Sequence, residues 1–183
     1  NNRMNPKILL SNKKIGIILI RLCHQLIERH GDFSNTVLVG LQPRGTLLMD
    51  RLLQLLNQEG IDSIKSGKLD TTFFRDDFRR NEKPLNAKTT EMNEIVEGKD
   101  VVIIDDVLFT GRSIRSALSA IDSYGRPKSI ELLVMVDRRF SRQLPIQPDY
   151  LGAQVDALQG DKVRVVWSKK HSESIVYIEK NNE

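Results

Sequence analysis

The chain has 183 residues, of which 39% are hydrophobic, so it can bury one substantial core and we expect a single domain over residues 1–183. Its formal charge of +4 suits a phosphate-rich partner, either a nucleotide or a nucleic acid. The longest apolar stretch, around residues 15–20, is far below the roughly 18 residues that cross a bilayer. We therefore expect no membrane partner and a cytoplasmic location, which the single cysteine, Cys23, also favours.

The first predicted element is a helix over residues 12–29. Ser11 can cap its start, apolar residues recur at helical spacing, and Gly31 ends the pattern. The other face carries three basic side chains, those of Arg21, His24 and Arg29. They are interpreted either as solvated surface or as a contact for nucleic acid.

A strand over residues 37–39, a loop and a helix over residues 46–58 form the next predicted unit. The loop places Arg44 beside Gly45 at a helix N-terminus, where backbone N–H groups favour an anion. A turn with proline and glycine also occurs for structural reasons alone. Residues 61–74 are predicted as two strands, the second over 69–74.

A long polar stretch follows, from residue 75 to about 94. A loop of this length in a compact domain is usually a functional lid or an inert excursion, and we favour a flexible lid over about 75–97.

Residues 101–113 are the most informative stretch of the chain. Four β-branched apolar residues, 101–104, predict a strand buried on both faces. The strand leads to Asp105 and Asp106, then to a short turn, and to a helix that Ser113 can cap. Ligands bind outside the carboxyl ends of strands in open α/β sheets, so the site is expected here.

The rest of the chain predicts a buried strand over residues 130–136, a proline-rich segment over 144–150, and a hairpin formed by 163–167 and 175–178. Strands and helices alternate through the middle and short strands close the chain. The predicted fold class is therefore α/β, with a mostly parallel sheet flanked by helices and a small β-rich hood over about residues 137–183 that the first-helix region joins.

The acidic strand end allows two chemical interpretations besides a purely structural one. A magnesium-holding strand of a P-loop NTPase would require a Gly-x4-Gly-Lys-Ser/Thr loop, which the sequence lacks. A Gly-x-Gly-x-x-Gly dinucleotide fingerprint is missing too. The second interpretation is a grip on ribose 5-phosphate, in which the carboxylates accept from sugar hydroxyls and the loop holds the phosphate.

These thirteen residues closely resemble the 5-phosphoribosyl-1-pyrophosphate (PRPP) motif of type I phosphoribosyltransferases, and residues 41–45 resemble that superfamily's pyrophosphate loop. Together with residues 73–77, 136–138 and 144–152, they are similar to the pyrimidine-operon attenuation regulators that double as uracil phosphoribosyltransferases. The match runs from about Ile8 to the end of the chain.

The resemblance implies a glycosyltransferase that converts uracil and PRPP to UMP and pyrophosphate, with Mg²⁺ held mainly by the pyrophosphate. By this resemblance Asp105, Asp106 and Arg75 are the catalytic residues, and Val136, Asp137 and Arg138 form a hood over the base. The implied PRPP-binding residues are Arg44, Gly45, Asp105, Asp106, Val107, Leu108, Phe109, Thr110, Gly111, Arg112 and Ser113. Phe109 stands where the family commonly has Tyr.

The resemblance also implies UMP-dependent binding of pyrimidine-operon mRNA and a homodimer or higher homo-oligomer. The matching RNA-binding positions are Arg21, His24, Arg29 and Arg142. Around the last of these the chain departs from the family pattern, because Arg139-Phe140-Ser141 replaces a usual Gly-His pair. Two alternatives stay open from the sequence, namely a transferase without RNA regulation and a transferase specific for another base.

Overall fold

The structure is a computed structural model that describes residues 6–72, 92, 96–169 and 173–181. Its described strands are β1 (Pro6–Leu10), β2 (Thr36–Leu41), β3 (Lys65–Leu69), β4 (Asp100–Leu108), β5 (Ser129–Arg139), β6 (Tyr150–Asp156), β7 (Lys162–Val166) and β8 (Ile175–Glu179). Its described helices are α1 (Asn12–His30), α2 (Gly45–Gln58), α3 (Arg112–Ile121) and a 3-10 turn at Asp122–Tyr124. The part of the chain that the structure describes includes no helix with the length and apolar character to cross a membrane.

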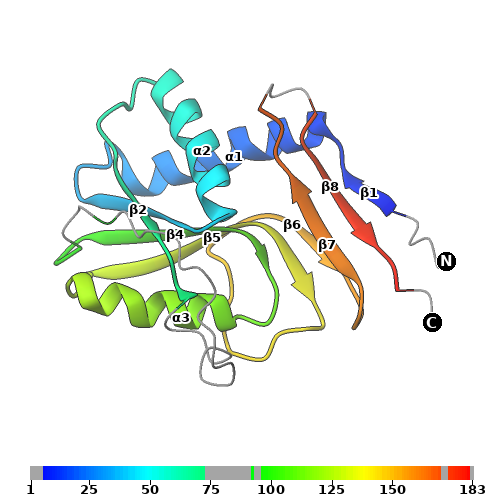
Figure 1. Cartoon of the computed structure of the whole chain (residues 1–183). Helices are drawn as coiled ribbons and strands as arrows, with labels where there is room; N and C mark the ends of the chain where they lie inside the picture. Colours follow the sequence, from blue (N-terminus) through cyan, green and yellow to red (C-terminus); the bar gives the residue numbers. More distant parts are fainter. Residues whose placement is uncertain (1–5, 73–91, 93–95, 170–172, 182–183) are drawn as a thin grey trace.

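A five-stranded parallel sheet forms the centre of the molecule, in the order β3-β2-β4-β5-β6. Helices α1 and α2 cover one face and α3 covers the other (Figure 1). Successive residues of β4 alternate between the two cores, so Val102 and Ile104 pack with α1 and α2 while Val101 and Ile103 pack with α3. The predicted α/β fold class is confirmed.

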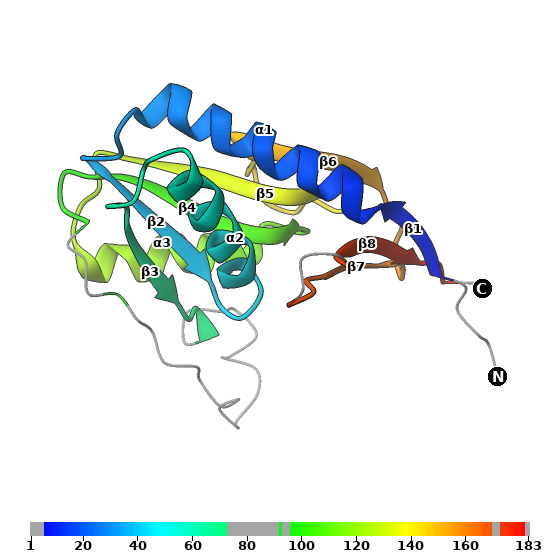
Figure 2. The same ribbon diagram turned by 90° about the horizontal axis from the view of Figure 1, so that it is seen from above.

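The hood is a separate antiparallel sheet in the order β1-β8-β7. Its β7–β8 hairpin was predicted, whereas β1 was not, since β1 pairs with a strand nearly the whole chain away. Figure 2 shows this sheet beyond the start of α1, beside the edge of the main sheet to which the parallel strands point. The hood therefore stands next to the carboxyl ends of the central strands.

The first helix follows its sequence signals. The Ser11 hydroxyl accepts a hydrogen bond from the Lys14 N–H at 3.3 Å, and Gly31 ends the helix with φ of 59°. Both predicted boundaries of the helix are thus confirmed to within one residue.

Three local expectations were wrong within the described residues. Between α2 and β4 the described residues form only one strand, β3, because the Asp70 side chain accepts from the N–H and hydroxyl of Thr72 and turns the chain. Strand β4 continues through the acidic pair to Leu108, since its pairing with β5 continues to that residue. Gly111, which adopts the left-handed conformation, is the N-cap of helix α3, so Ser113 is not.

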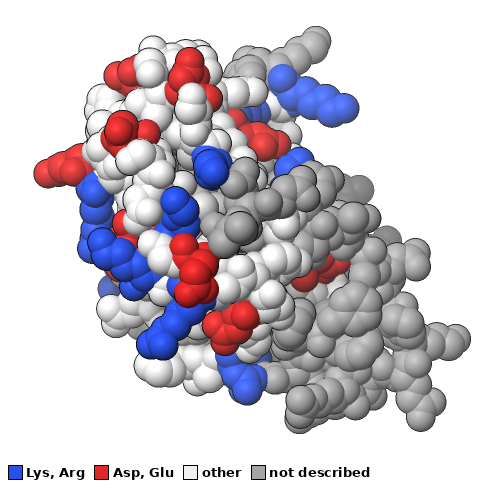
Figure 3. All heavy atoms as spheres, turned by 90° about the vertical axis from the view of Figure 1, so that its left-hand side faces the viewer, with Lys and Arg blue, Asp and Glu red and all other residues white. Residues whose placement is uncertain are grey.

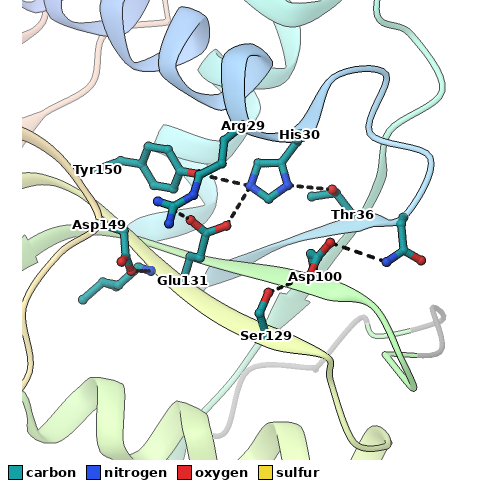
Figure 4. A network of polar contacts seen from close by, with 10 residues as sticks. Arg29, His30, Thr36, Asp100, Ser129, Glu131, Asp149 and Tyr150 are labelled. Carbon is teal, nitrogen blue, oxygen red and sulfur yellow. Dashed lines mark hydrogen bonds and ion pairs between the residues drawn. The ribbon is translucent and has the colours of Figure 1, made fainter.

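A buried polar network joins the starting ends of the central strands, at the edge opposite the hood. His30, at the end of α1, lies between Thr36 (Nδ1 to Oγ1, 2.9 Å) and Glu131 (Nε2 to Oε1, 2.8 Å) (Figure 4). A proton on Nε2 lets the ring donate to the carboxylate while the Thr36 hydroxyl donates to Nδ1. Arg29 and Tyr150 also contact Glu131 in this network.

Acidic and basic side chains are interspersed on the exterior of this end of the molecule (Figure 3). Charges of both signs therefore share the visible surface there, and no large patch of one sign covers its described part.

Candidate active site

Two loops meet at the carboxyl edge of the central sheet. Arg44 precedes α2 in the β2–α2 loop, and its Nε lies 2.8 Å from Oδ2 of Asp106 on β4. The Asp106 side chain is 8% exposed and that of Arg44 is 49% exposed, so the arginine faces outward over a buried acid. Arg44 also donates through Nη2 to the carbonyl of Val165 on β7. One guanidinium thus links the β2–α2 loop, strand β4 and the hood.

Gly45 allows this close approach. A Cβ built on Gly45 would lie 2.2 Å from the carbonyl oxygen of Ile104 and 3.0 Å from the Cα of Asp105. Any side chain here would push the start of α2 away from β4. The glycine predicted in the pyrophosphate loop is therefore required by packing against the acidic strand end.

The turn after β4 forms a small hollow of about 70 Å³, lined by Asp105, Val107, Leu108, Phe109, Thr110, Gly111, Ser113 and Ile114. This is roughly the volume of two water molecules, so it suits a group of a few heavy atoms. Gly111 takes a φ of 93°, and α3 begins directly after it. The helix N-terminus and the turn amides therefore favour an anion in this hollow.

The end of β5 contributes three predicted hood residues, which lie in different surroundings. Val136 is fully buried in the core, so its side chain is not available to a ligand. Asp137 forms an ion pair with Arg142. Arg138 is 7% exposed and lies 4.1 Å above the centre of the Phe109 ring.

Arg138 connects the hood to the turn after β4. Its Nη2 donates to the carbonyl oxygens of Asp161 (3.1 Å) and Leu158 (3.5 Å), while Nε has no hydrogen-bond partner among the described atoms. Burial lowers the pKa of this guanidinium, and the charge of Asp161 opposes the shift. No sequence pattern marked Asp161, which lies far along the chain from the motif.

The predicted RNA-binding residues of α1 all have partners within the chain. Arg21 donates to the carbonyls of Leu151 and Gly152 on the outer edge of β6, at 3.0 and 2.7 Å. His24 lies 3.6 Å from Glu59. The third residue of the set, Arg29, forms a 2.9 Å ion pair with Glu131 and lies 5.8 Å above the Tyr150 ring.

The fourth predicted RNA-binding residue, Arg142, lies elsewhere. It contacts Asp137 and the carbonyl oxygen of Phe109 at the carboxyl edge of the sheet, whereas Arg29 contacts the starting edge. A hollow of about 400 Å³ beside it is lined by Asp137, Arg142, Leu144, Pro145, Ile146, Gln147, Pro148, Leu151 and Gln154.

Arg75 and the predicted lid, apart from residues 92, 96 and 97, lie outside the described residues. Among the residues that are described, no group of three or more His, Cys, Asp or Glu side chains is arranged to hold a metal ion. Asp105 and Asp106 are nevertheless adjacent at the site, with the Asp106 N–H donating to Oδ1 of Asp105 at 2.9 Å.

Comparison with solved structures supports the fold. A hypoxanthine-guanine phosphoribosyltransferase of Leishmania tarentolae aligns with a TM-score of 0.69 at 12% identity, covering 98% of this chain and 99% of that one. A hypoxanthine phosphoribosyltransferase of Staphylococcus aureus aligns with a TM-score of 0.63 at 24% identity, covering 82% and 78%. The family model for the phosphoribosyl transferase domain matches residues 6–168. Fold and site together define a phosphoribosyltransferase domain.

Curated relatives identify the family within the phosphoribosyltransferases that the chain resembles in sequence. A protein of Nostoc punctiforme is 42% identical over 88% of this chain and 91% of its own length. Another, of Bacillus subtilis, is 35% identical over 97% and 99%. Both carry the name Bifunctional protein PyrR. The chain therefore belongs to the PyrR family of phosphoribosyltransferases.

Proposed function

We propose that this protein is a uracil phosphoribosyltransferase that converts uracil and PRPP to UMP and pyrophosphate. The carrying observation is the arrangement at the carboxyl edge, where Arg44 spans the β2–α2 loop and the acidic pair of β4. A cationic loop beside two carboxylates and an anion-sized turn suits a ribose that carries a phosphate at one end and a pyrophosphate at the other.

Each part of the site has a role in this reaction. Asp105 and Asp106 accept hydrogen bonds from the ribose hydroxyls, and the turn at 109–113 holds the 5-phosphate. Arg44 binds the pyrophosphate, whose negative charge grows as its bond to the ribose breaks. A transition state with oxocarbenium character gains most from groups that stabilise this separation of charge.

The base enters beside the end of β5, under the hood. Asp137 and Arg138 border this side of the site, and Arg142 forms an ion pair with Asp137. Arg75, from outside the described residues, is proposed to reach the pyrophosphate when residues 75–97 close as a lid.

Magnesium fits this site as a companion of the substrate. Mg²⁺ is typically bound through one or two carboxylates plus substrate phosphates, and the adjacent pair Asp105 and Asp106 supplies that many. The ion would supply charge neutralisation to the pyrophosphate oxygens. The protein's own residues hold the ribose and orient the leaving group.

The assay uses labelled uracil, PRPP and Mg²⁺, with product separated as UMP. We expect UMP from the wild type and a loss of at least 100-fold in kcat/KM for Asp106→Asn. Absence of UMP, or Asp105→Asn and Asp106→Asn enzymes that match the wild type, would contradict the proposal. Hypoxanthine and guanine are run in parallel, and turnover of a purine in place of uracil would assign a different base.

We also propose UMP-dependent binding of pyrimidine-operon leader RNA. The name Bifunctional protein PyrR of the relatives supports a second activity, and the side chains of His24 and Arg29 are more than half exposed despite their partners. Binding would then use the outer side of groups that are already oriented by Glu59 and Glu131.

A gel shift on leader RNA tests this role. We expect UMP to strengthen binding and the double variant Arg21→Ala/Arg29→Ala to weaken it at least tenfold. Lys128→Ala removes the same kind of charge from an exposed site near the end of α3 and serves as the control. Circular dichroism checks that each variant is folded. RNA binding that UMP does not strengthen and that survives the double variant would contradict this proposed role.

Assembly as a homodimer or higher homo-oligomer completes the proposal. It is tested by analytical ultracentrifugation across a range of protein concentrations, with a monomer at all concentrations as the contradicting result.

A further inference from the structure

Arg142 makes two contacts within the chain, which indicate that its side chain is not free to bind RNA. Its Nη1 donates to the carbonyl oxygen of Phe109 at 3.1 Å, and its Nη2 pairs with Oδ1 of Asp137. The side chain is 23% exposed and that of Asp137 is 8% exposed. The planar fork of arginine satisfies both partners at once, which a single ammonium group cannot do with the same geometry.

The residues after Arg142 continue along the same turn. The backbone N–H groups of Gln143 and Leu144 both donate to the carbonyl oxygen of Thr110, at 2.9 and 3.3 Å. The Gln143 side chain accepts from Nε of Arg112 at 2.7 Å. Three successive residues of one segment thus bind three of the four residues from Phe109 to Arg112.

Apolar packing closes the fourth position. A Cβ built on Gly111 would lie 3.3 Å from Cδ1 of Ile146 and 3.4 Å from Cβ of Leu144. The segment 142–146 therefore covers the turn that forms the small hollow at the end of β4.

The direction of these bonds carries the argument. A turn that binds an anion must aim its N–H groups at the ligand, and the carbonyls of the same peptides then point elsewhere and need donors. Arg142, Gln143 and Leu144 provide donors to the carbonyls of Phe109 and Thr110. A turn fixed in this way binds its ligand without first losing conformational freedom.

We infer that Arg142 is a positioning residue for the phosphate end of the substrate, because it holds the turn at 109–112 in its anion-binding shape. The inference rests on the proposed function and deepens it. It also joins the two halves of the reaction, since the same guanidinium neutralises Asp137 beside the base side of the site.

The test compares Arg142→Lys with Arg139→Lys. Arg139 is a neighbouring arginine whose only described ion pair is with the exposed Asp156. Its substitution therefore shows the effect of an Arg-to-Lys change that does not alter the contacts of the turn. Binding of ribose 5-phosphate and of pyrophosphate is measured by isothermal titration calorimetry. We expect Arg142→Lys to weaken the binding of ribose 5-phosphate at least tenfold and that of pyrophosphate less than twofold. Arg139→Lys should change neither affinity.

Steady-state kinetics adds a second measurement, because substitution of a purely structural residue would not change the KM of one substrate selectively. We expect the KM for PRPP to rise at least tenfold in Arg142→Lys, with less than threefold change in the KM for uracil. If Arg142→Lys is not folded, Asp137→Asn/Arg142→Met, which removes both charges of the ion pair, takes its place with the same expectation for ribose 5-phosphate.

The outcomes separate the two proposals. Wild-type binding of ribose 5-phosphate with an unchanged Arg142→Lys variant overturns the inference and leaves the transferase intact. An Arg142→Lys variant that loses only leader RNA assigns the side chain to RNA and also overturns it. A wild type that binds neither ribose 5-phosphate nor PRPP overturns both the inference and the proposed function.

Discussion

Nε of Arg44 lies 2.8 Å from Oδ2 of Asp106, so the cation of the β2–α2 loop contacts an acid of strand β4. The same guanidinium donates to the carbonyl of Val165 on the hood. If Arg44 binds the pyrophosphate as proposed, it exchanges these two partners for the substrate, and the free energy of PRPP binding includes that exchange.

Replacing Arg44 tests its role as a ligand of the pyrophosphate. Arg44→Ala should raise the KM for PRPP about 10- to 100-fold, because a hydrogen bond to a charged group is worth about 1.5–3 kcal/mol. Arg51→Ala is the matched control, since Arg51 donates to the hood at Ser168 and lies 5.7 Å above the Trp167 ring. Equal losses of PRPP affinity in both variants would show that the effect comes from the lost contact between the arginine and the hood.

Gly45 offers a test of the contact between the start of α2 and strand β4. Gly45→Ala should destabilise the protein by about 1–3 kcal/mol, because its Cβ would meet the Ile104 carbonyl. Urea unfolding measures the change. Gly16→Ala is the control, since no atom within 4 Å obstructs a Cβ on that residue of α1, and it should stabilise by about 0.5–1 kcal/mol. An unaltered stability in Gly45→Ala would mean that the loop can move.

Cys23 should resist alkylation in the folded protein. Burial, with a smaller effect of the Glu59 charge, raises the pKa of its thiol from 9.0 to about 12. Because the folded state keeps this proton more tightly, the stabilisation it gives is complete below pH 9 and is lost as the pH rises towards 12. Iodoacetamide labelling followed by mass spectrometry at pH 8 should show reaction only in denaturant, and rapid labelling of native protein would contradict the expectation.

The sequence predicted the parts of the fold that are encoded locally. The run of β-branched residues at 101–104 predicted a strand covered on both faces, and Ser11 with Gly31 marked α1. Strand β6 was missed, because Gly152 and Ala153 weaken its β signal. A Cβ on Gly152 would lie 2.2 Å from the Met135 carbonyl oxygen, so that glycine serves tertiary packing instead.

The sequence predicted that Arg44, Gly45 and the motif after β4 lie close together, but it did not predict the contacts of the residues after β5. Arg44, Gly45 and the motif at 105–113 lie together as their order in an α/β sheet requires. The contacts of Arg142 and Arg138 depend on how the segments after β5 fold back, and residue type alone carries no signal for that. From the sequence, Arg142 was predicted to bind RNA and Arg138 to border the base.

Asp100 provides the final prediction, at the starting edge of the sheet (Figure 4). Its pKa is held below the usual 3.8, first by the hydrogen bond from Ser129 at 2.7 Å, against an opposing effect of burial. Ser129→Ala should therefore raise the Asp100 pKa, as measured by carboxyl carbon NMR. Because a depressed pKa stabilises above its unfolded value, the wild type should exceed the variant in stability at pH 7.

That advantage should shrink as the pH falls below 3.8 and Asp100 takes up its proton in both proteins. Ser119→Ala, which removes a hydroxyl bonded only to a helix carbonyl at 3.3 Å among the described contacts, is the control. Urea unfolding at pH 7 and pH 3 gives the comparison. A stability difference between wild type and Ser129→Ala that is the same at both pH values would mean that the hydroxyl acts through packing and not through the Asp100 carboxylate.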